Sequence, residues 1–155
     1  MSEPFILGIA EWVALPDLKL PAIRVKVDTG AKTSALGVYR LEPISGPTVR
    51  FTVHPVPGRP DIEIGCEALL VDRREVVSSN GTRETRPLIT TTLEIGGRHW
   101  PIEVTLTNRE HMTYRMLLGR QALPAGTLVE PSAVRLQPRL SYSLYGRGRV
   151  KAAKS

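Results

Sequence analysis

Residues 25–36 read VKVDTGAKTSAL, an apolar strand that runs into a tight turn and leaves through small residues. Apolar and basic side chains alternate just before the turn, which is the period-two pattern of a β-strand with one buried face. The strand ends directly on Asp28, and Gly30 permits a sharp change of direction after it. Because Asp is seldom buried without a partner, a carboxylate fixed at this point suits a catalytic acid or base.

The composition is that of one folded globular domain. The chain has 155 residues, of which 41% are hydrophobic and 23% charged. No apolar run approaches the roughly 20 residues that span a bilayer, and residues 1–4 lack the features of a signal peptide. Cys66 is the only cysteine, so no internal disulfide can form. We therefore expect a cytoplasmic protein with no membrane partner.

The formal net charge is +6, and part of it lies close to the C-terminus. Arg147, Arg149, Lys151 and Lys154 alternate there with small residues. This pattern predicts one folded domain at residues 1–140 followed by a basic, flexible tail at 141–155. The charge favours an acidic partner without indicating a specific nucleic acid.

Turn residues and β-branched residues predict an all-β domain. Thirteen Pro and thirteen Gly are spread along the chain, and no long 3.6-residue period appears. Asn80-Gly81 is a strong hairpin signal, and the polar arms on either side predict a ribbon that projects from a small closed barrel. We expect a helical turn at 121–123, and in the first strand Ile9 should face inward and Glu11 outward. The expected strands lie at residues 5–14, 22–27, 33–36, 38–41, 49–53, 61–71, 71–77, 83–92, 90–95, 99–106, 116–120, 128–130 and 134–136.

A second element, Leu117-Leu118-Gly119-Arg120, follows the Asp-Thr-Gly motif by about ninety residues. With the glycine-tipped ribbon between them, the two elements resemble the retropepsin-like aspartic peptidases. The resemblance implies a closed acid-protease barrel, a flap hairpin, and a short helix after Arg120. It also implies that Asp28 is the catalytic group and that Thr29 and Gly30 support it.

The chain resembles one bacterial family more closely, over roughly residues 5 to 145. The similar segments are EWVALP (11–16), VDTGAKTSAL (27–36), RP (86–87), TLTNR (105–109) and MLLGR (116–120). This family has been labelled an ATP-dependent zinc protease and is associated with RimK-type glutamate ligases. Its RimB-like members are implied to trim glutamate tails that the ligase adds to a ribosomal protein.

The zinc label has little support in the residues. His54, His99 and His111 are far apart, and none belongs to a His-Glu-x-x-His pair. Cys66-Glu67 would supply ligands only if the fold brought other ligands close. No phosphate-binding Gly-rich loop with Gly-Lys-Ser/Thr is present either. We therefore predict no metal and no cofactor, and keep a zinc metallopeptidase as an alternative.

Aspartic peptidases need two carboxylates that share one proton. This chain has one Asp-Thr-Gly, and Asp61 and Asp72 lack a following Thr/Ser-Gly. A two-fold homodimer would bring two copies of Asp28 together. The alternative is that Asp28-Thr29-Gly30 is only a β-turn, in which Asp and Gly are common.

Lys32 stands where the retropepsin resemblance implies an acidic residue paired with the later arginine, Arg120. Two neighbouring cations without that carboxylate would favour a substrate carboxylate between them. We therefore predict substrate binding by Lys32 and Arg120, with Ala31 beside them and with Arg83 and Arg86 of the ribbon closing over an acidic peptide. The alternatives are that Lys32 points to solvent and Arg120 pairs with Glu42 or Glu130, and that the ribbon arginines are only solvated.

The predicted function is aspartic-type hydrolysis of peptide bonds in an acidic, glutamate-rich protein tail, with a ribosomal protein as one expected target and a RimK-type ligase as an expected partner. The alternative from another class is a non-catalytic basic module that docks on the ligase or the ribosome.

Overall fold

The computed structural model describes residues 4–42, 46–77, 80–108 and 113–146. Strands dominate, and the only helical pieces in these ranges are short 3₁₀ turns. The elements are β1 (Ile6–Leu7), β2 (Ala10–Leu15), η1 (Pro16–Leu18), β3 (Leu20–Asp28), β4 (Ser34–Gly37), β5 (Arg40–Leu41), β6 (Thr48–Val53), β7 (Ile64–Val77), β8 (Arg83–Ile95), β9 (Arg98–Thr107), β10 (Met116–Gly119), η2 (Arg120–Ala122), β11 (Leu128–Val129) and η3 (Tyr142–Tyr145).

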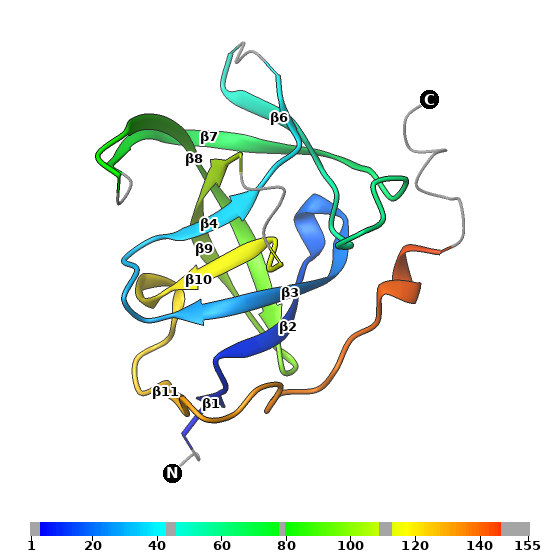
Figure 1. Cartoon of the computed structure of the whole chain (residues 1–155), viewed down its shortest axis with the longest axis vertical. Coiled ribbons are helices and arrows are strands. Elements are labelled where there is room, and N and C mark those ends of the chain that lie inside the picture. Colours follow the sequence, from blue (N-terminus) through cyan, green and yellow to red (C-terminus); the bar gives the residue numbers. More distant parts are fainter. Residues whose placement is uncertain (1–3, 43–45, 78–79, 109–112, 147–155) are drawn as a thin grey trace.

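Six strands close into a barrel in the order β2-β3-β10-β4-β9-β8, and β8 pairs back to β2 (Figure 1). Closure removes the unpaired sheet edges that would otherwise template aggregation. The interior is filled by aliphatic side chains from alternate strand positions, including Ile23, Val25, Leu36, Ile89 and Leu118. The predicted all-β, retropepsin-like closed barrel is thus confirmed.

The long hairpin of β7 and β8 is shared between the barrel and the predicted ribbon. Burial alternates from Ile64 to Ala68, whereas residues 71–77 are exposed or half-buried. A register shift between Leu70 and Asp72 marks the change, as expected where a bulge bends a strand. The distal ends of both strands lie on the same side of the barrel as the loop after β3 (Figure 1).

The strand order around β10 joins parts of the chain that are far apart in sequence. β10 lies between β3 and β4, parallel to the first and antiparallel to the second. Met116 to Gly119 are in register with Val25 to Asp28, so the two predicted motif elements end side by side. The packing of β10 therefore positions the loop that follows Asp28.

The predicted first strand is divided, and two side-chain orientations in it were wrong. Ile9 is 39% exposed, while Glu11 is 1% exposed. The Glu11 carboxylate accepts hydrogen bonds from the backbone N–H groups of Gly8 (2.7 Å), Leu136 (3.0 Å) and Gln137 (3.1 Å). These charge-assisted bonds compensate the buried charge.

The predicted strand at 134–136 is also wrong, because its backbone bonds to the Glu11 side chain and to Ala10 instead of forming a strand ladder. Past residue 140, η3 packs on the barrel, and the Tyr145 hydroxyl donates to the carbonyl of Ala22 at 2.6 Å. The four basic tail residues lie outside the described residues, and the boundary at 140 stays a prediction. In the part of the chain that the structure describes, no helix has the length and apolar character to cross a membrane.

Candidate active site

The Asp28 side chain is held at the turn by its own loop. Its Oδ1 accepts a hydrogen bond from the N–H of Gly30 at 3.0 Å, and its carbonyl accepts one from Ala31 at 3.1 Å. Asp28 is half-buried, whereas Thr29 and Gly30 are exposed. This arrangement orients one carboxylate oxygen and leaves the second without a hydrogen-bond partner within the described ranges. A carboxylate fixed in this way can exchange a proton with a bound molecule.

The Leu-Leu-Gly-Arg element braces this loop from behind. The N–H of Gly119 donates to Ser34 Oγ at 3.0 Å, and that of Arg120 donates to the carbonyl of Ala31 at 2.9 Å. One turn on, Trp100 Nε1 donates to the carbonyl of Ala122 at 2.7 Å and so anchors η2 to the barrel. The loop is therefore fixed by strands from both halves of the chain.

Gly119 is in contact with the backbone that follows the motif, which gives a test of the bracing. A Cβ at this position would lie 2.7 Å from the carbonyl carbon of Thr33 and 2.8 Å from its oxygen. We expect Gly119→Ala to lower the free energy of unfolding by about 1–3 kcal/mol, as overpacking typically does. Gly65→Ala is the matched control, because a Cβ there meets nothing within 4 Å. Chemical denaturation checks this, and equal stability of the two variants would contradict the close contact.

Arg120 directs its guanidinium at the loop. Its Nη1 lies 3.2 Å from the carbonyl oxygens of both Thr29 and Gly30 and donates to them. Neither Glu42 nor Glu130 forms an ion pair with Arg120 within the described ranges. The observed contact stabilises the motif, and carboxylate binding by Arg120 stays a prediction.

A cavity of about 390 Å³ lies between the motif loop and the ribbon. Ala31, Lys32 and Arg86, three of the predicted substrate-binding residues, are on its wall. Arg83 is not on this wall and pairs with Glu75 at 2.6 Å. The sequence interpretation missed Arg74, which lines the same cavity. Only the pairing of β7 with β8 identifies Arg74 as a candidate, because it places this residue directly opposite Arg86.

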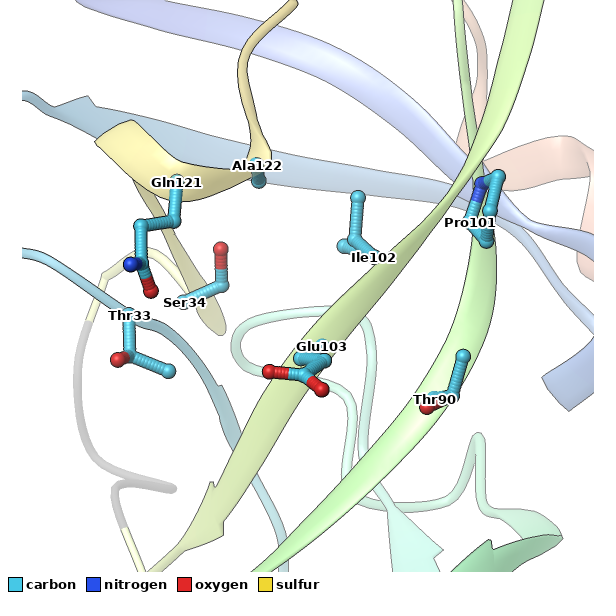
Figure 2. Close-up of a pocket in the computed structure, with 8 residues that line it drawn as sticks. All are labelled: Thr33, Ser34, Thr90, Pro101, Ile102, Glu103, Gln121 and Ala122. Atoms are coloured by element: carbon cyan, nitrogen blue, oxygen red, sulfur yellow. The ribbon is translucent and has the colours of Figure 1, made fainter. Parts of the chain in front are cut away.

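A second cavity of about 500 Å³ adjoins the first at Thr33, which lines both. Figure 2 shows Thr33 and Gln121 on one side and Glu103 facing them from β9. The first cavity is rich in cations, whereas among the described residues that line the second cavity Glu103 is the one with a charge. The two adjoining cavities therefore differ in electrostatic character.

The described residues give no grouping of three or more His, Cys, Asp or Glu that would hold a metal ion. His54 is buried, lies 3.0 Å from Glu63 through Nε2 and stacks on Tyr39. His99 is exposed on the β8–β9 hairpin, and His111 lies outside the described residues. The residues described here do not fit a zinc site.

Cys66 is buried and donates through Sγ to the carbonyl of Leu18 at 3.3 Å. Burial raises the pKa of its thiol from 9.0 to about 12. Burial likewise raises the pKa of Tyr145. Both groups are therefore structural and remain protonated at neutral pH.

These raised pKa values predict a loss of stability in alkali. Since the unfolded thiol ionises near pH 9 and the folded one near 12, the contribution of Cys66 is fully present below pH 9 and is lost as the pH rises toward 12. At about 1.4 kcal/mol for each pKa unit, the loss is on the order of 4 kcal/mol. Denaturation midpoints measured from pH 7 upward should fall less steeply for Cys66→Ala than for the wild type. Identical slopes would contradict the prediction.

The closed barrel, the Asp-Thr-Gly loop at the end of one strand and the strand that braces it define a retropepsin-like fold. Residues 6–140 match the model of the RimB-like family, described as the retropepsin-like aspartic endopeptidase RimB, and the chain belongs to this family.

Three relatives illustrate how far the similarity extends. A probable alpha-L-glutamate ligase of Shewanella pealeana is 46% identical over 134 residues, covering 84% of this chain and 29% of that protein. A protein of the same name from Parasynechococcus marenigrum is 42% identical over 134 residues, which again cover 84% of this chain and 29% of that protein. The crystal structure of Lpg0085, a Legionella pneumophila protein of unknown function, has a TM-score of 0.70 at 28% identity, covering 86% of this chain and 98% of that one. The chain thus spans less than a third of the length of the curated relatives it matches.

Proposed function

We propose that the chain is an aspartic endopeptidase that cleaves peptide bonds in an acidic, glutamate-rich protein tail. The observation that carries this proposal is the Asp28 carboxylate, oriented by the Gly30 N–H at 3.0 Å on the barrel of an endopeptidase family. In the ionised form such a carboxylate takes a proton from water as the water oxygen attacks the peptide carbonyl. A second carboxylate, protonated, donates to the carbonyl oxygen. Return of a proton to the amide nitrogen then lets the C–N bond break.

The second carboxylate is the Asp28 of another copy. The sequence has one Asp-Thr-Gly, Asp61 is paired with Arg59, and Asp72 is exposed on the ribbon. A two-fold axis beside the exposed Thr29 and Gly30 would place two such loops face to face.

An apolar edge made of Ile6, Ile9 and Leu128 supports an interface between two copies of the chain. These residues are 39%, 39% and 53% exposed, and Ile6 is the register partner of Leu128. The carbonyl of Ile9 accepts a hydrogen bond from Val27, one residue before Asp28, at 2.8 Å. Burial of exposed apolar groups against a second chain is favourable, and we assign this edge to the second copy.

Two observations support an acidic substrate. Lys32 lines the cavity beside the motif and has no ion pair within the described ranges. The relatives named probable alpha-L-glutamate ligase carry a similar region in a longer chain, which links this domain to glutamate ligation. A ligase of that class would supply the tail, and a modified ribosomal protein is one target to test.

The direct test is incubation of the purified protein with an oligoglutamate-tailed protein, followed by mass spectrometry for new termini. Cleavage within or beside the tail supports the proposal, and the same yield in the presence of a chelator argues against a zinc enzyme. Binding of the ligase or the tailed protein without new termini would favour a non-catalytic module.

A further inference from the structure

The cavity under the ribbon has a concentration of positive charge. Arg74 and Arg86 face each other directly across β7 and β8, and Lys32 approaches the same cavity from the motif loop. Like charges directly opposite each other in an antiparallel pair are destabilising. Carboxylates of the protein, or an anion in the cavity, would relieve this repulsion.

The carboxylates around the cavity do not satisfy all of these cations. Glu84 bonds Arg86 at 2.5 Å, and Glu75, which lines the cavity, is paired with Arg83 at 2.6 Å. Both ion pairs are short, and both join residues of the ribbon. Arg86 and Glu75 are therefore neutralised locally.

Arg74 is held much more loosely. Its nearest carboxylate oxygen, on Glu103, is 3.7 Å away, and Thr33 Oγ1 lies at 3.5 Å, near the outer limit for a hydrogen bond. The side chains of Arg74 and Glu103 are 38% and 50% exposed, so this pair contributes little. Of the described residues that line this cavity, Arg74 and Lys32 are thus the two cations available to a ligand.

We propose that Lys32 and Arg74 form a subsite for one side-chain carboxylate of the substrate, with Arg74 as the residue that determines this specificity. This inference rests on the proposed peptidase function, and it assigns the preference for acidic substrates to the subsite formed by these two residues. An incoming carboxylate forms charge-assisted hydrogen bonds to the Arg74 guanidinium and displaces Glu103. Because Glu103 remains on the wall of the adjoining cavity (Figure 2), that cavity suits an uncharged side chain.

The test measures binding separately from cleavage. Fluorescence anisotropy of a labelled oligoglutamate peptide is recorded with Asp28→Asn protein, which should bind the peptide without cleaving it. The same measurement is then made on double variants that carry Arg74→Gln or Lys32→Gln in addition to Asp28→Asn. We expect each to weaken binding by about tenfold or more, and Glu103→Gln to tighten it. Arg50→Gln is the matched control, because it removes the same charge from a residue that is 68% exposed and paired with Glu67. It should change the Kd by less than about twofold.

A panel of peptides with each Glu replaced in turn by Gln locates the subsite. One position should account for most of the loss, and its effect should disappear in Arg74→Gln because the two changes remove the same interaction. Equal weakening at every position, or an Arg74→Gln variant that matches Arg50→Gln while keeping the wild-type melting temperature, would overturn the subsite. Cleavage by the protein with Asp28 intact decides the peptidase function independently: tight binding through Arg74 without cleavage keeps the subsite and refutes the enzyme.

Discussion

Replacing Asp28 with Asn is expected to abolish cleavage of an oligoglutamate-tailed protein while the barrel stays folded. Asn has nearly the same shape, and its side-chain oxygen can still accept the bond from the Gly30 N–H. It cannot take a proton from water, so the carboxylate chemistry is lost. Loss of a residue of this kind lowers kcat by on the order of a thousandfold or more.

The matched control is Asp61→Asn, which removes one carboxylate from an exposed pair with Arg59. Kinetics of tail removal and thermal melting are measured for both variants. Full activity is expected for Asp61→Asn, together with a melting temperature of Asp28→Asn close to that of the wild type. Cleavage at the wild-type rate by Asp28→Asn would rule out the proposed catalytic role.

A mixture of wild-type protein with a ninefold excess of Asp28→Asn should lose most of its activity. If two subunits share one site and exchange freely, only about one wild-type chain in ten finds a wild-type partner, so activity per wild-type chain falls about tenfold. Independent monomers would show no loss, because each would carry its own complete site. Activity measured over a range of mixing ratios distinguishes the two cases.

The apolar edge provides a second way to separate the subunits. Leu128→Asp places a charge at an exposed position beside Ile6, and we expect monomers in analytical ultracentrifugation and loss of cleavage. Leu69→Asp is the control, since Leu69 is 66% exposed on β7, where it pairs with Thr48. A dimeric, active Leu128→Asp protein would place the interface elsewhere.

Features set by local chemistry could be predicted from the sequence. The alternation at residues 22–27 required only the period of a strand, and β3 ends on Asp28 as expected. The hairpin at Asn80-Gly81 and the one at Gly96-Gly97 follow from residues that tolerate positive φ, and the three glycines have φ of 86°, 60° and 79°. Such signals depend on a few neighbouring residues.

Features set by distant partners could not be predicted. Glu11 appears exposed by its place in an alternating strand, yet it is buried because N–H groups about 125 residues later bond to it. The guanidinium of Arg120 finds carbonyl oxygens some ninety residues earlier in the chain, which no spacing rule reveals. The juxtaposition of Arg74 and Arg86 likewise depends on the β7–β8 register, which the sequence does not fix residue by residue.

The central claim is that two copies of Asp28 form one catalytic pair. A crystal structure of the assembled, active protein measures this directly as the distance between the two Asp28 carboxylates. We predict that their nearest oxygens lie about 3 Å apart, close enough to share one proton. Separation beyond about 6 Å in a form that cleaves the tail would contradict the claim, because the two carboxyl groups would then titrate and act independently.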